Sequence, residues 1–444
     1  MTELTGWGRY PRHPSQVFSP ASPKALLPLM AHETGLVARG NGRAYGDAAI
    51  GERVTVLARG LDRIRTFDQA TGRICVEAGV LLSDLLDLVV PRGFFPPVVP
   101  GTKFVTIGGM IASDVHGKNH HRDGGFGDHI ESLTLALPDG STVTCSQDEN
   151  PELLLATVGG MGLTGTILDV TFRLRPIETG WMRQKTTVAP DLDNAIRALQ
   201  DTSKATYSVA WIDCLARGAS LGRSLIFAAE HATLRDVEAL SPSAEPFPSS
   251  KLGRLSVPID LPSFSLNRLS VSAFNEFYFR AGALKAGYPF LMHWNPYFFP
   301  LDGIGSWNRI YGRRGFLQHQ CVVPTEHARP VLGSIIERVS KHGNASFLAV
   351  LKQLGSSRGN LSFPLEGFTL TLDLPVSDDV FPLLDELDRL VVEAGGRLYL
   401  AKDARQSPAT FEAGYPGLGR FRDVRRAIGA TGRISSRLSA RLGI

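Results

Sequence analysis

The sequence has few cysteines and no dense block of charge. Its 444 residues include only 4 cysteines: Cys75, Cys145, Cys214 and Cys321. They lie far apart and form neither a CxxC motif nor a Cys/His metal-binding pattern. We therefore expect no metal site and expect the thiols to be free and buried. The net charge of +4, without a concentrated Lys/Arg run, argues against nucleic-acid binding.

Long apolar runs are also missing. No segment approaches the roughly 18 apolar residues of a spanning helix, and the first residues lack the apolar centre of a signal peptide. We expect a soluble protein that is cytoplasmic or peripheral to the plasma membrane, with the periplasmic side left open. The arginines over 420–441 alternate with apolar residues. This spacing favours a solvated helix face over a polyanion site and leaves a weak attraction to anionic lipid open.

The order of strand and helix signals predicts an α+β protein of two domains. In the first region, 1–180, strands are expected at 54–57, 74–78, 132–137 and 166–174, and helices at 81–90 and 151–156. In the second region, 181–396, helices are expected at 191–200 and 378–394. One strand is expected to end at Trp211, and three more are expected at 316–323, 345–351 and 368–374. A Pro- and Ser-rich stretch predicts a lid or long loop near 241–300. The C-terminal segment, 397–444, is expected to begin with a strand, continue with helices and return to the first domain.

The stretch Ala38-Arg-Gly-Asn-Gly-Arg-Ala-Tyr-Gly-Asp47 is the most informative part of the chain. Gly40, Gly42 and Gly46 allow a tight turn whose N–H groups can approach an anion, and two arginines add positive charge. Taken alone, this loop is either a phosphate cradle or a plain turn. Four further segments favour the cradle: 100–112, 113–121, 126–129 and 158–165.

The order of these motifs resembles the FAD-binding domain of the PCMH-type, or vanillyl-alcohol-oxidase-type, flavoproteins. R-G-x-G-R-x-Y-G-D is followed by P-G-T…G-G, H-G-K-N-H and G-G-x-G-L-T-G. More narrowly, the chain resembles the decaprenylphosphoryl-ribose 2-oxidases of arabinan synthesis, with further matches at 6–9, 306–309, 315–318 and 399–403. The resemblance implies a two-domain fold whose substrate domain is built on an antiparallel sheet.

The resemblance also implies an FAD site. The positions that match cofactor contacts are Arg39, Gly40, Asn41, Gly42, Arg43, Ala44, Tyr45, Gly101, Thr102, Gly108, Gly109, Ala112, Ser113, His116, Gly117, Asn119, Gly162, Thr164, Gly165, Ile167 and Tyr399. Many relatives bond the flavin covalently through a histidine that Arg43 replaces here. We therefore expect FAD to be bound non-covalently.

Alternation along three expected strands groups their polar side chains. Gln318 and Gln320 share one face, Lys352 shares a face with Val350, and Thr369, Thr371 and Asp373 oppose the apolar side of their strand. The pattern alone favours a solvent-exposed sheet face, whereas the resemblance implies a wall over the flavin. The positions that match substrate contacts are Trp211, Gln318, Gln320, Lys352, Thr369 and Thr371.

The implied chemistry is oxidation of a sugar secondary alcohol with hydride transfer to the flavin. Lys402 matches the essential lysine of the family, and His116 and Tyr45 are expected in the same pocket; the alternative for Lys402 is a surface ion pair with Asp403. Whether Lys402 or His116 takes the proton stays open. Thr371 stands where the family has a cysteine that covalent nitro-aromatic inhibitors attack. Thr369 replaces an asparagine, which leaves the fine substrate specificity open.

The implied function is FAD-dependent oxidation of the C2 hydroxyl of a polyprenyl-phospho-β-D-ribose to the 2-keto sugar. This would be the first half of an epimerisation to the arabinose form, with a short-chain reductase as pathway partner. A soluble aldonolactone or alditol oxidase that uses oxygen is one alternative, and a non-catalytic flavin-binding partner or sensor is another. The aromatic run 288–300 is either core or a guide for a prenyl tail or membrane contact.

Overall fold

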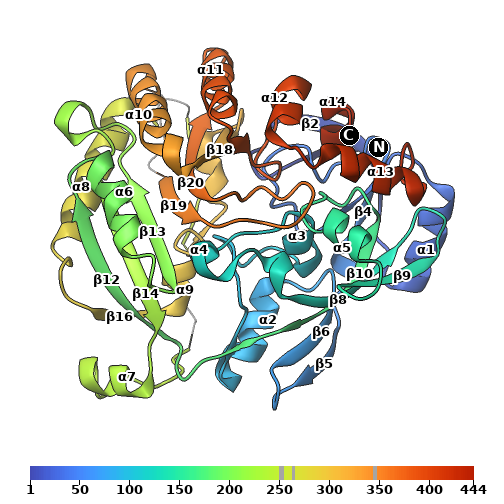
Figure 1. Cartoon of the computed structure of the whole chain (residues 1–444), viewed down its shortest axis with the longest axis horizontal. Coiled ribbons are helices and arrows are strands. Elements are labelled where there is room, and N and C mark those ends of the chain that lie inside the picture. The colour runs from blue at the N-terminus through green and yellow to red at the C-terminus, as the bar shows by residue number, and fades with distance from the viewer. Residues whose placement is uncertain (250–254, 263–265, 344–347) are drawn as a thin grey trace.

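The first region forms two sheets (Figure 1). The computed structural model describes residues 1–249, 255–262, 266–343 and 348–444. One sheet has the strand order β1 (Thr2–Thr5), β2 (Arg12–Phe18), β4 (Val54–Leu57) and β3 (Leu36–Arg39). The other is antiparallel, in the order β5 (Ile64–Asp68), β6 (Arg73–Glu77), β10 (Thr166–Arg173), β8 (Ile130–Ala136) and β9 (Thr142–Ser146).

Short helices cover these sheets and carry the glycine-rich segments. They are α1 (Pro23–His32), α2 (Leu82–Val89), α3 (Ile107–Ala112), α4 (His120–Asp123) and α5 (Pro151–Thr157). Leu85 and Leu86 of α2 pack in one fully buried cluster with Val76 of β6 and Phe172 of β10. A two-stranded pair, β7 (Phe94–Phe95) and β11 (Arg175–Pro176), ends this region. This packing fixes the strand ends from which the loops of the site emerge.

The second region is built on an eight-stranded antiparallel sheet. Its order is β16 (Phe290–His293), β12 (Trp181–Ala189), β14 (Ser224–His231), β13 (Tyr207–Ile212), β19 (Ala349–Leu354), β20 (Gly367–Pro375), β18 (Phe316–Pro324) and β21 (Arg397–Leu398). Three helices cover one face: α6 (Leu192–Asp201), α10 (Thr325–His342) and α11 (Val380–Glu393). Leu370, Leu372 and Leu374 of β20 pack against Ile336 of α10 and Leu387 of α11. The odd-numbered residues of β20 therefore face the other side. These findings confirm the two-domain α+β fold with an antiparallel substrate sheet.

The expected long loop near 241–300 is wrong over much of its length. The described part of this stretch contains β15 (Leu255–Ser256), the 16-residue helix α8 (Arg268–Ala283), β16 and α9 (Trp294–Phe298). The helix begins at Asn267, whose side chain caps the N–H groups of Leu269 and Ser270. Residues 250–254 and 263–265 of the expected loop lie outside the described residues. Helix α7 (Leu234–Leu240) comes directly before this stretch, and β15 pairs with β17 (Ile304–Gly305) after it.

The aromatic run at 288–300 is mostly core. Trp294, Tyr297, Phe298 and Phe299 are buried in the same cluster as Phe95. Tyr288, in contrast, is 83% exposed.

The thiols are free, but Cys75 is only partly buried, because its strand is not fully covered on that face. The strand expected over 397–403 is limited to β21, since the chain turns at Tyr399. Residues 345–347 of the strand expected over 345–351 lie outside the described residues.

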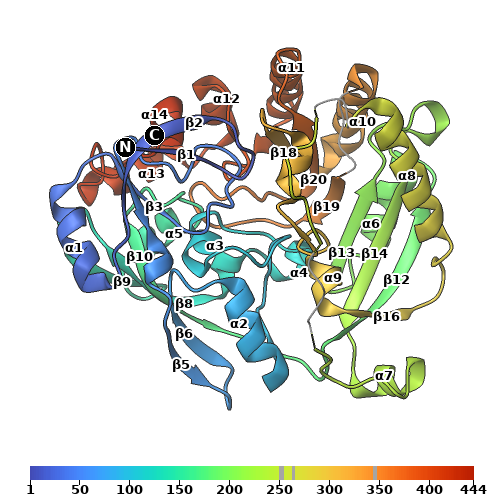
Figure 2. The ribbon, with the colours of Figure 1, turned by 180° about the vertical axis from the view of Figure 1, so that it is seen from behind.

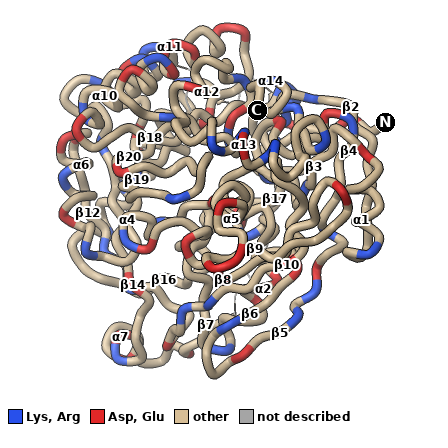
Figure 3. Tube along the Cα trace, turned by 45° about the vertical axis from the view of Figure 1, so that its right-hand side comes forward, with Lys and Arg blue, Asp and Glu red and all other residues tan. Residues whose placement is uncertain are grey.

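The C-terminal segment packs against the first region and ends near the N-terminus. Its helices are α12 (Pro408–Gly414), α13 (Leu418–Ala427) and α14 (Arg437–Leu442). Phe411 and Phe421 share a buried cluster with Leu163 and Met161. Figure 3 shows basic and acidic positions interspersed along the trace. Arg422 pairs with Glu412, so the arginines of this end are partly neutralised. No helix among the described residues has the length and apolarity needed to cross a membrane.

Candidate active site

A cavity of about 400 Å³ lies between the first region and the uncovered face of the eight-stranded sheet. Its wall combines the loop after β3, the segments on both sides of α3, the turn before β10 and the strands β18, β20, β19 and β13. Tyr399, Ala401 and Lys402 of the C-terminal segment complete it. Residues that are far apart in sequence therefore meet at one place.

The loop after β3 presents free backbone donors to this cavity. The N–H groups from Gly40 to Ala44 form no hydrogen bond with any residue that the structure describes, whereas the N–H of Tyr45 donates to the Ala401 carbonyl oxygen at 2.9 Å. Gly42 has a φ of 63°, in the left-handed region that favours glycine. A Cβ on Gly40 would lie 2.2 Å from Oγ1 of Thr106. A tightly packed loop with a row of unpaired donors fits a pyrophosphate.

The two arginines of the loop have different surroundings. Arg39 donates to the carbonyl oxygens of Ala49 and Thr5 at 3.3 and 2.7 Å and lies outside the cavity wall. Arg43 lines the cavity, and its guanidinium carbon lies 3.8 Å from the centroid of the Trp7 ring. Its Nε is buried without a hydrogen-bond partner among the described residues. Arg43 therefore supplies the positive charge that faces the cavity, while Arg39 stabilises the loop through its hydrogen bonds to the backbone.

Most other positions matched to cofactor contacts also line the cavity. They are Asn41, Ala44, Tyr45, Gly101, Thr102, Gly108, Gly109, Ala112, Ser113, His116, Gly117, Gly162, Gly165, Ile167 and Tyr399. A Cβ on Gly108 would lie 2.7 Å from Cβ of Ala78, whereas one on Gly101 would meet no atom within 4 Å. A slot with glycine walls and unpaired loop donors fits FAD, which is flat at its ring system and carries two phosphates.

Asn119 and Thr164 lie outside the wall, as Arg39 does. Asn119 donates from Nδ2 to the Pro97 carbonyl oxygen at 2.8 Å and to Asp123 at 2.7 Å. Thr164 is fully buried, with its Oγ1 2.9 Å from Oγ1 of Thr157. The expectation that these residues contact the cofactor does not match their positions. Short polar side chains in tight loops bond to neighbouring chain segments, and both residues stabilise the loops behind the cavity.

The register of the sheet brings one row of side chains to the cavity. Gln320 of β18 pairs with Thr371 of β20, and Thr371 pairs with Val350 of β19. Val350 pairs in turn with Trp211 of β13. Directly paired residues project from the same face, and all four line the cavity. The row changes from polar at β18 to apolar at β13.

The apolar end continues across β14 to α8. Val209 of β13 pairs with Phe227 of β14, and both line the cavity. The Tyr278 ring of α8 lies 4.9 Å from the Trp211 ring. Thr369, at the polar end, accepts a hydrogen bond from Nε2 of Gln320 at 3.3 Å and lies behind it, outside the wall. Thr369 therefore does not occupy the position expected of a substrate contact.

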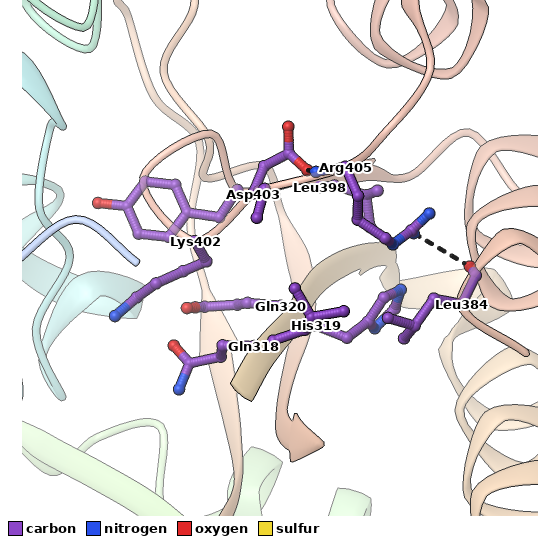
Figure 4. Close-up of a pocket in the computed structure, with 11 residues that line it drawn as sticks. Gln318, His319, Gln320, Leu384, Leu398, Lys402, Asp403 and Arg405 are labelled. Carbon is purple, nitrogen blue, oxygen red and sulfur yellow. Dashed lines mark hydrogen bonds between the residues drawn. The ribbon is translucent and has the colours of Figure 1, made fainter. Parts of the chain in front are cut away.

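Lys402 points into the cavity rather than toward Asp403. Its Nζ lies 3.8 Å from the centroid of the Tyr45 ring. Asp403 instead accepts a hydrogen bond from Arg441 at 2.9 Å. Figure 4 shows Lys402 beside Gln318 and Gln320, where a smaller pocket adjoins the sheet. Burial lowers the pKa of Lys402 to about 8, although the nearby Asp373 favours its charged form.

Asp373 is a buried carboxyl group at the polar end. It accepts a hydrogen bond from Nε2 of Gln318 at 2.5 Å and one from the Tyr311 hydroxyl at 3.4 Å. Burial raises the pKa of Asp373 to about 7, while Gln318, Lys402 and Tyr311 oppose the shift. Around neutral pH this carboxyl group is therefore close to its titration point.

His116 is held between two strands. Its Nδ1 lies 3.1 Å from Nζ of Lys352, and its Nε2 lies 2.9 Å from Nε2 of Gln320. Burial, followed by the charge of Lys352, moves the pKa of His116 well below its ordinary value, so the ring is neutral at neutral pH. Burial also lowers the pKa of Lys352 to about 7. A neutral histidine and a lysine that titrates near neutral pH thus lie in contact.

Lys118 is a cavity residue that the sequence reasoning did not single out. Its ammonium donates to the Tyr297 carbonyl oxygen and lies 4.1 Å from the centroid of the Tyr297 ring. Burial lowers the pKa of Lys118 to about 7, and Lys352 adds to the shift. The signal was present, because Lys118 lies inside the His-Gly-Lys-Asn-His motif.

Comparisons with known proteins identify the family and the cofactor. A family model described as an FAD binding domain matches residues 14–146. The chain is 36% identical to decaprenylphosphoryl-β-D-ribose oxidase of Mycolicibacterium smegmatis, over 99% of this chain and 97% of that protein. It is 35% identical to an uncharacterized protein of Streptomyces coelicolor, over 82% of this chain and all of that protein. An L-gulonolactone oxidase of Mus musculus is 27% identical over 36% of this chain and 37% of that protein.

Proposed function

Since the chain belongs to the family of decaprenylphosphoryl-β-D-ribose oxidase and is an FAD-dependent oxidoreductase, we propose that it oxidises the C2 hydroxyl of a polyprenyl-phospho-β-D-ribose. The observation that carries the proposal is the polar-to-apolar row across the sheet, from Gln320 through Thr371 and Val350 to Trp211. Neighbouring strands lie about 4.8 Å apart. A substrate with a sugar at one end and a prenyl chain at the other fits such a wall.

The cofactor would lie on the first-region side of the cavity. The N–H groups from Gly40 to Ala44 and the Arg43 guanidinium would hold the pyrophosphate, and the glycine-lined slot would hold the ring system. When bound, FAD would supply the acceptor for the hydride that leaves the sugar carbon. It is held without a covalent bond, because Arg43 cannot form the linkage that a histidine would and both ring nitrogens of His116 have protein partners.

Lys402 and Tyr45 serve the electrostatics of the reaction. Lys402 provides a fixed cation in a buried wall, where it stabilises negative charge that develops during hydride transfer. The Tyr45 ring under its Nζ keeps the flexible side chain in place. A group that is already oriented needs no reorganisation at the moment of reaction.

His116 takes the hydroxyl proton and passes a proton to Lys352. The amide of Gln320 can leave Nε2 of His116 because Oγ1 of Thr369 is an alternative acceptor at 3.3 Å. Nε2 then accepts the substrate proton, and the proton on Nδ1 moves to the neutral amine of Lys352, 3.1 Å away. The pKa of Lys352, lowered to about 7 by burial, supports this transfer near neutral pH. The relay starts with a neutral lysine and ends with an ammonium group.

The prenyl tail runs over Val209, Trp211 and Phe227 and leaves the cavity beside Tyr278 of α8. Three exposed apolar side chains form a stripe along the outer face of α8 and its C-cap: Leu269, Phe277 and Leu284, which are 83%, 73% and 89% exposed. Figure 2 shows α8 along the outer side of the sheet. We infer that this stripe rests on a membrane in which the tail remains dissolved. The resulting ketone would be reduced by a short-chain reductase to complete the epimerisation.

Anaerobic bleaching of the flavin tests the proposed function. The purified protein is mixed with polyprenyl-phospho-ribose, with polyprenyl-phosphate and with free aldonolactones and alditols. We expect rapid bleaching only with the lipid-linked ribose, and a 2-keto sugar as product. Bleaching by free sugars with peroxide formation in air would instead establish the aldonolactone or alditol oxidase alternative.

A further inference from the structure

The orientation of one glutamine at the polar end is fixed by a buried acid. Gln318 and Asp373 are direct register partners on β18 and β20. Nε2 of Gln318 donates to Oδ1 of Asp373 at 2.5 Å, and both side chains are buried. An ionised carboxylate can only accept hydrogen bonds, so it requires the NH₂ end of the amide. Lys402 favours the ionised form of this carboxyl group.

The consequence lies on the cavity side. Gln318 lines the cavity, and its side chain also forms a hydrogen bond with Tyr45. With its NH₂ group on Asp373, its Oε1 still has a lone pair for a ligand. An amide oxygen accepts a hydrogen bond from a hydroxyl group but repels the oxygens of a phosphate. We propose that Asp373 is a positioning residue that turns Oε1 of Gln318 toward the cavity, so that this part of the wall binds a sugar hydroxyl and excludes the phosphate.

A cation nearer to the apolar end lies where a phosphate can then be placed. Lys118 lines the cavity from the loop after His116, and its carbonyl oxygen accepts a hydrogen bond from the N–H of Ser208 on β13. The pKa of Lys118, lowered to about 7 by burial, would rise again beside an anion. The order across the sheet becomes hydroxyl, phosphate and prenyl chain, which is the covalent order of the substrate. This inference rests on the proposed function and specifies how the substrate head is oriented.

A pair of substitutions at Asp373 separates positioning from charge. Asp373→Asn keeps a carbonyl oxygen that can accept from Gln318, whereas Asp373→Leu has similar size and no acceptor. We expect Asp373→Leu to weaken binding of polyprenyl-phospho-ribose about tenfold, and Asp373→Asn to stay within threefold of the native protein. Tyr311→Phe, which removes the 3.4 Å contact to the other carboxylate oxygen and keeps the ring, is the control for local disturbance and should bind normally. Equal losses in the Asn and Leu variants would overturn the inference.

Binding is measured by calorimetry on the FAD-loaded protein, so the result does not depend on turnover. If Asp373→Leu does not fold, Gln318→Met is compared with the native protein on substrates that each lack one ribose hydroxyl. The inference expects one deoxy analogue to bind both proteins equally, because it lacks the hydroxyl that Gln318 accepts. An equal loss of binding for every analogue would contradict it. Failure of the proposed function appears separately, as tight binding without flavin bleaching.

Discussion

The Nζ of Lys402 lies 3.8 Å from the centroid of the Tyr45 ring, and this contact joins the two loops that form the reactive end of the cavity. The loops also meet through the hydrogen bond from the N–H of Tyr45 to the Ala401 carbonyl oxygen. A Cβ on Gly46 would lie 2.0 Å from the Asp403 carbonyl oxygen, so the backbones are in close contact. The position of the lysine is therefore set by the loop that we propose as the cradle for the cofactor phosphates.

The rate of flavin reduction should depend on pH in a narrow bell. As pH rises through about 7, Lys352 loses its proton and can accept one from His116, so the rate increases. As pH rises through about 8, Lys402 loses its charge and the rate decreases. The measurement is the anaerobic reduction rate at saturating substrate between pH 5.5 and 10, in buffers of about constant ionic strength.

Single substitutions show which residue causes the ascending and which the descending limb of the pH profile. Lys402→Arg keeps a cation at all these pH values and should move the descending limb beyond pH 10, whereas Lys402→Met should bind FAD and reduce the rate about 100-fold or more. Lys352→Met should lose the ascending limb. Because burial also raises the pKa of Asp373 to about 7, Asp373→Asn is the necessary control. An ascending limb that disappears in Asp373→Asn and persists in Lys352→Met would refute the relay.

The alternation of polar residues could be predicted from the sequence, because a strand repeats its side-chain direction every two residues. This periodicity placed Gln318 and Gln320 on one face and Thr371 on the matching face of a second strand. The partner of Lys352 could not be predicted in the same way. His116 is 236 positions away, and only the packing of the first region against the sheet brings the two together.

Other features depended on local packing that motifs do not encode. Arg39 belongs to the same glycine-rich motif as Arg43, yet its guanidinium is taken by the backbone of Thr5 and Ala49. The sequence does not predict helix α8, because only Val271 among its apolar residues is fully buried and the others do not form a buried stripe with helical spacing. Its capping residue Asn267 was the signal that could have revealed it.

Acid precipitation should release all of the flavin. No covalent linkage is expected, since Arg43 stacks on Trp7 at the linking position. The supernatant should carry the whole flavin absorbance and the pellet should be colourless. Mass spectrometry of the denatured chain should give the unmodified mass, and an added mass equal to FAD would show that another side chain forms the bond.

Thr371→Cys should create a reactive site at the sheet wall. Thr371 lines the cavity next to Val350 and Gln320, so a thiol there would face a bound inhibitor. We expect the variant to retain turnover within about threefold, because the side chain does not take part in proton or hydride transfer, and to be trapped covalently by nitro-aromatic inhibitors during turnover. The native protein should show no adduct by intact mass. An adduct on the native chain would mean that one of its own cysteines is reachable.

Arg441 should be essential for holding the reactive loops together. Its guanidinium binds Asp47 at 2.9 Å and Asp403 at 2.9 Å, and both carboxylates are almost fully buried. Arg441→Met leaves two buried carboxylates without this cation, although Asp403 keeps the backbone N–H groups of Arg405 and Gln406, and should lower the free energy of unfolding by about 3 kcal/mol, with weaker retention of FAD. Arg441→Lys should lose less, because it keeps the charge but not the forked geometry. Urea unfolding of the FAD-loaded variants measures the effect, and equal losses in both would argue against a charge-based bridge.

The outer face of α8 should determine binding to membranes. Exposed apolar side chains at Leu269, Phe277 and Leu284 gain free energy when they enter the acyl region, and the nearby exposed Arg268 and Lys285 favour anionic headgroups. We expect the native protein to sediment with anionic vesicles and the double variant Phe277→Ser/Leu284→Ser to do so at least tenfold less.

Leu234→Ser on α7, where the leucine is 52% exposed, is the matched control and should bind vesicles as the native protein does. The double variant should still oxidise a short-chain, detergent-soluble substrate at the native rate, because the substituted side chains lie outside the cavity wall. Equal loss of vesicle binding in the α7 control would show that general surface apolarity, rather than the α8 stripe, makes the contact.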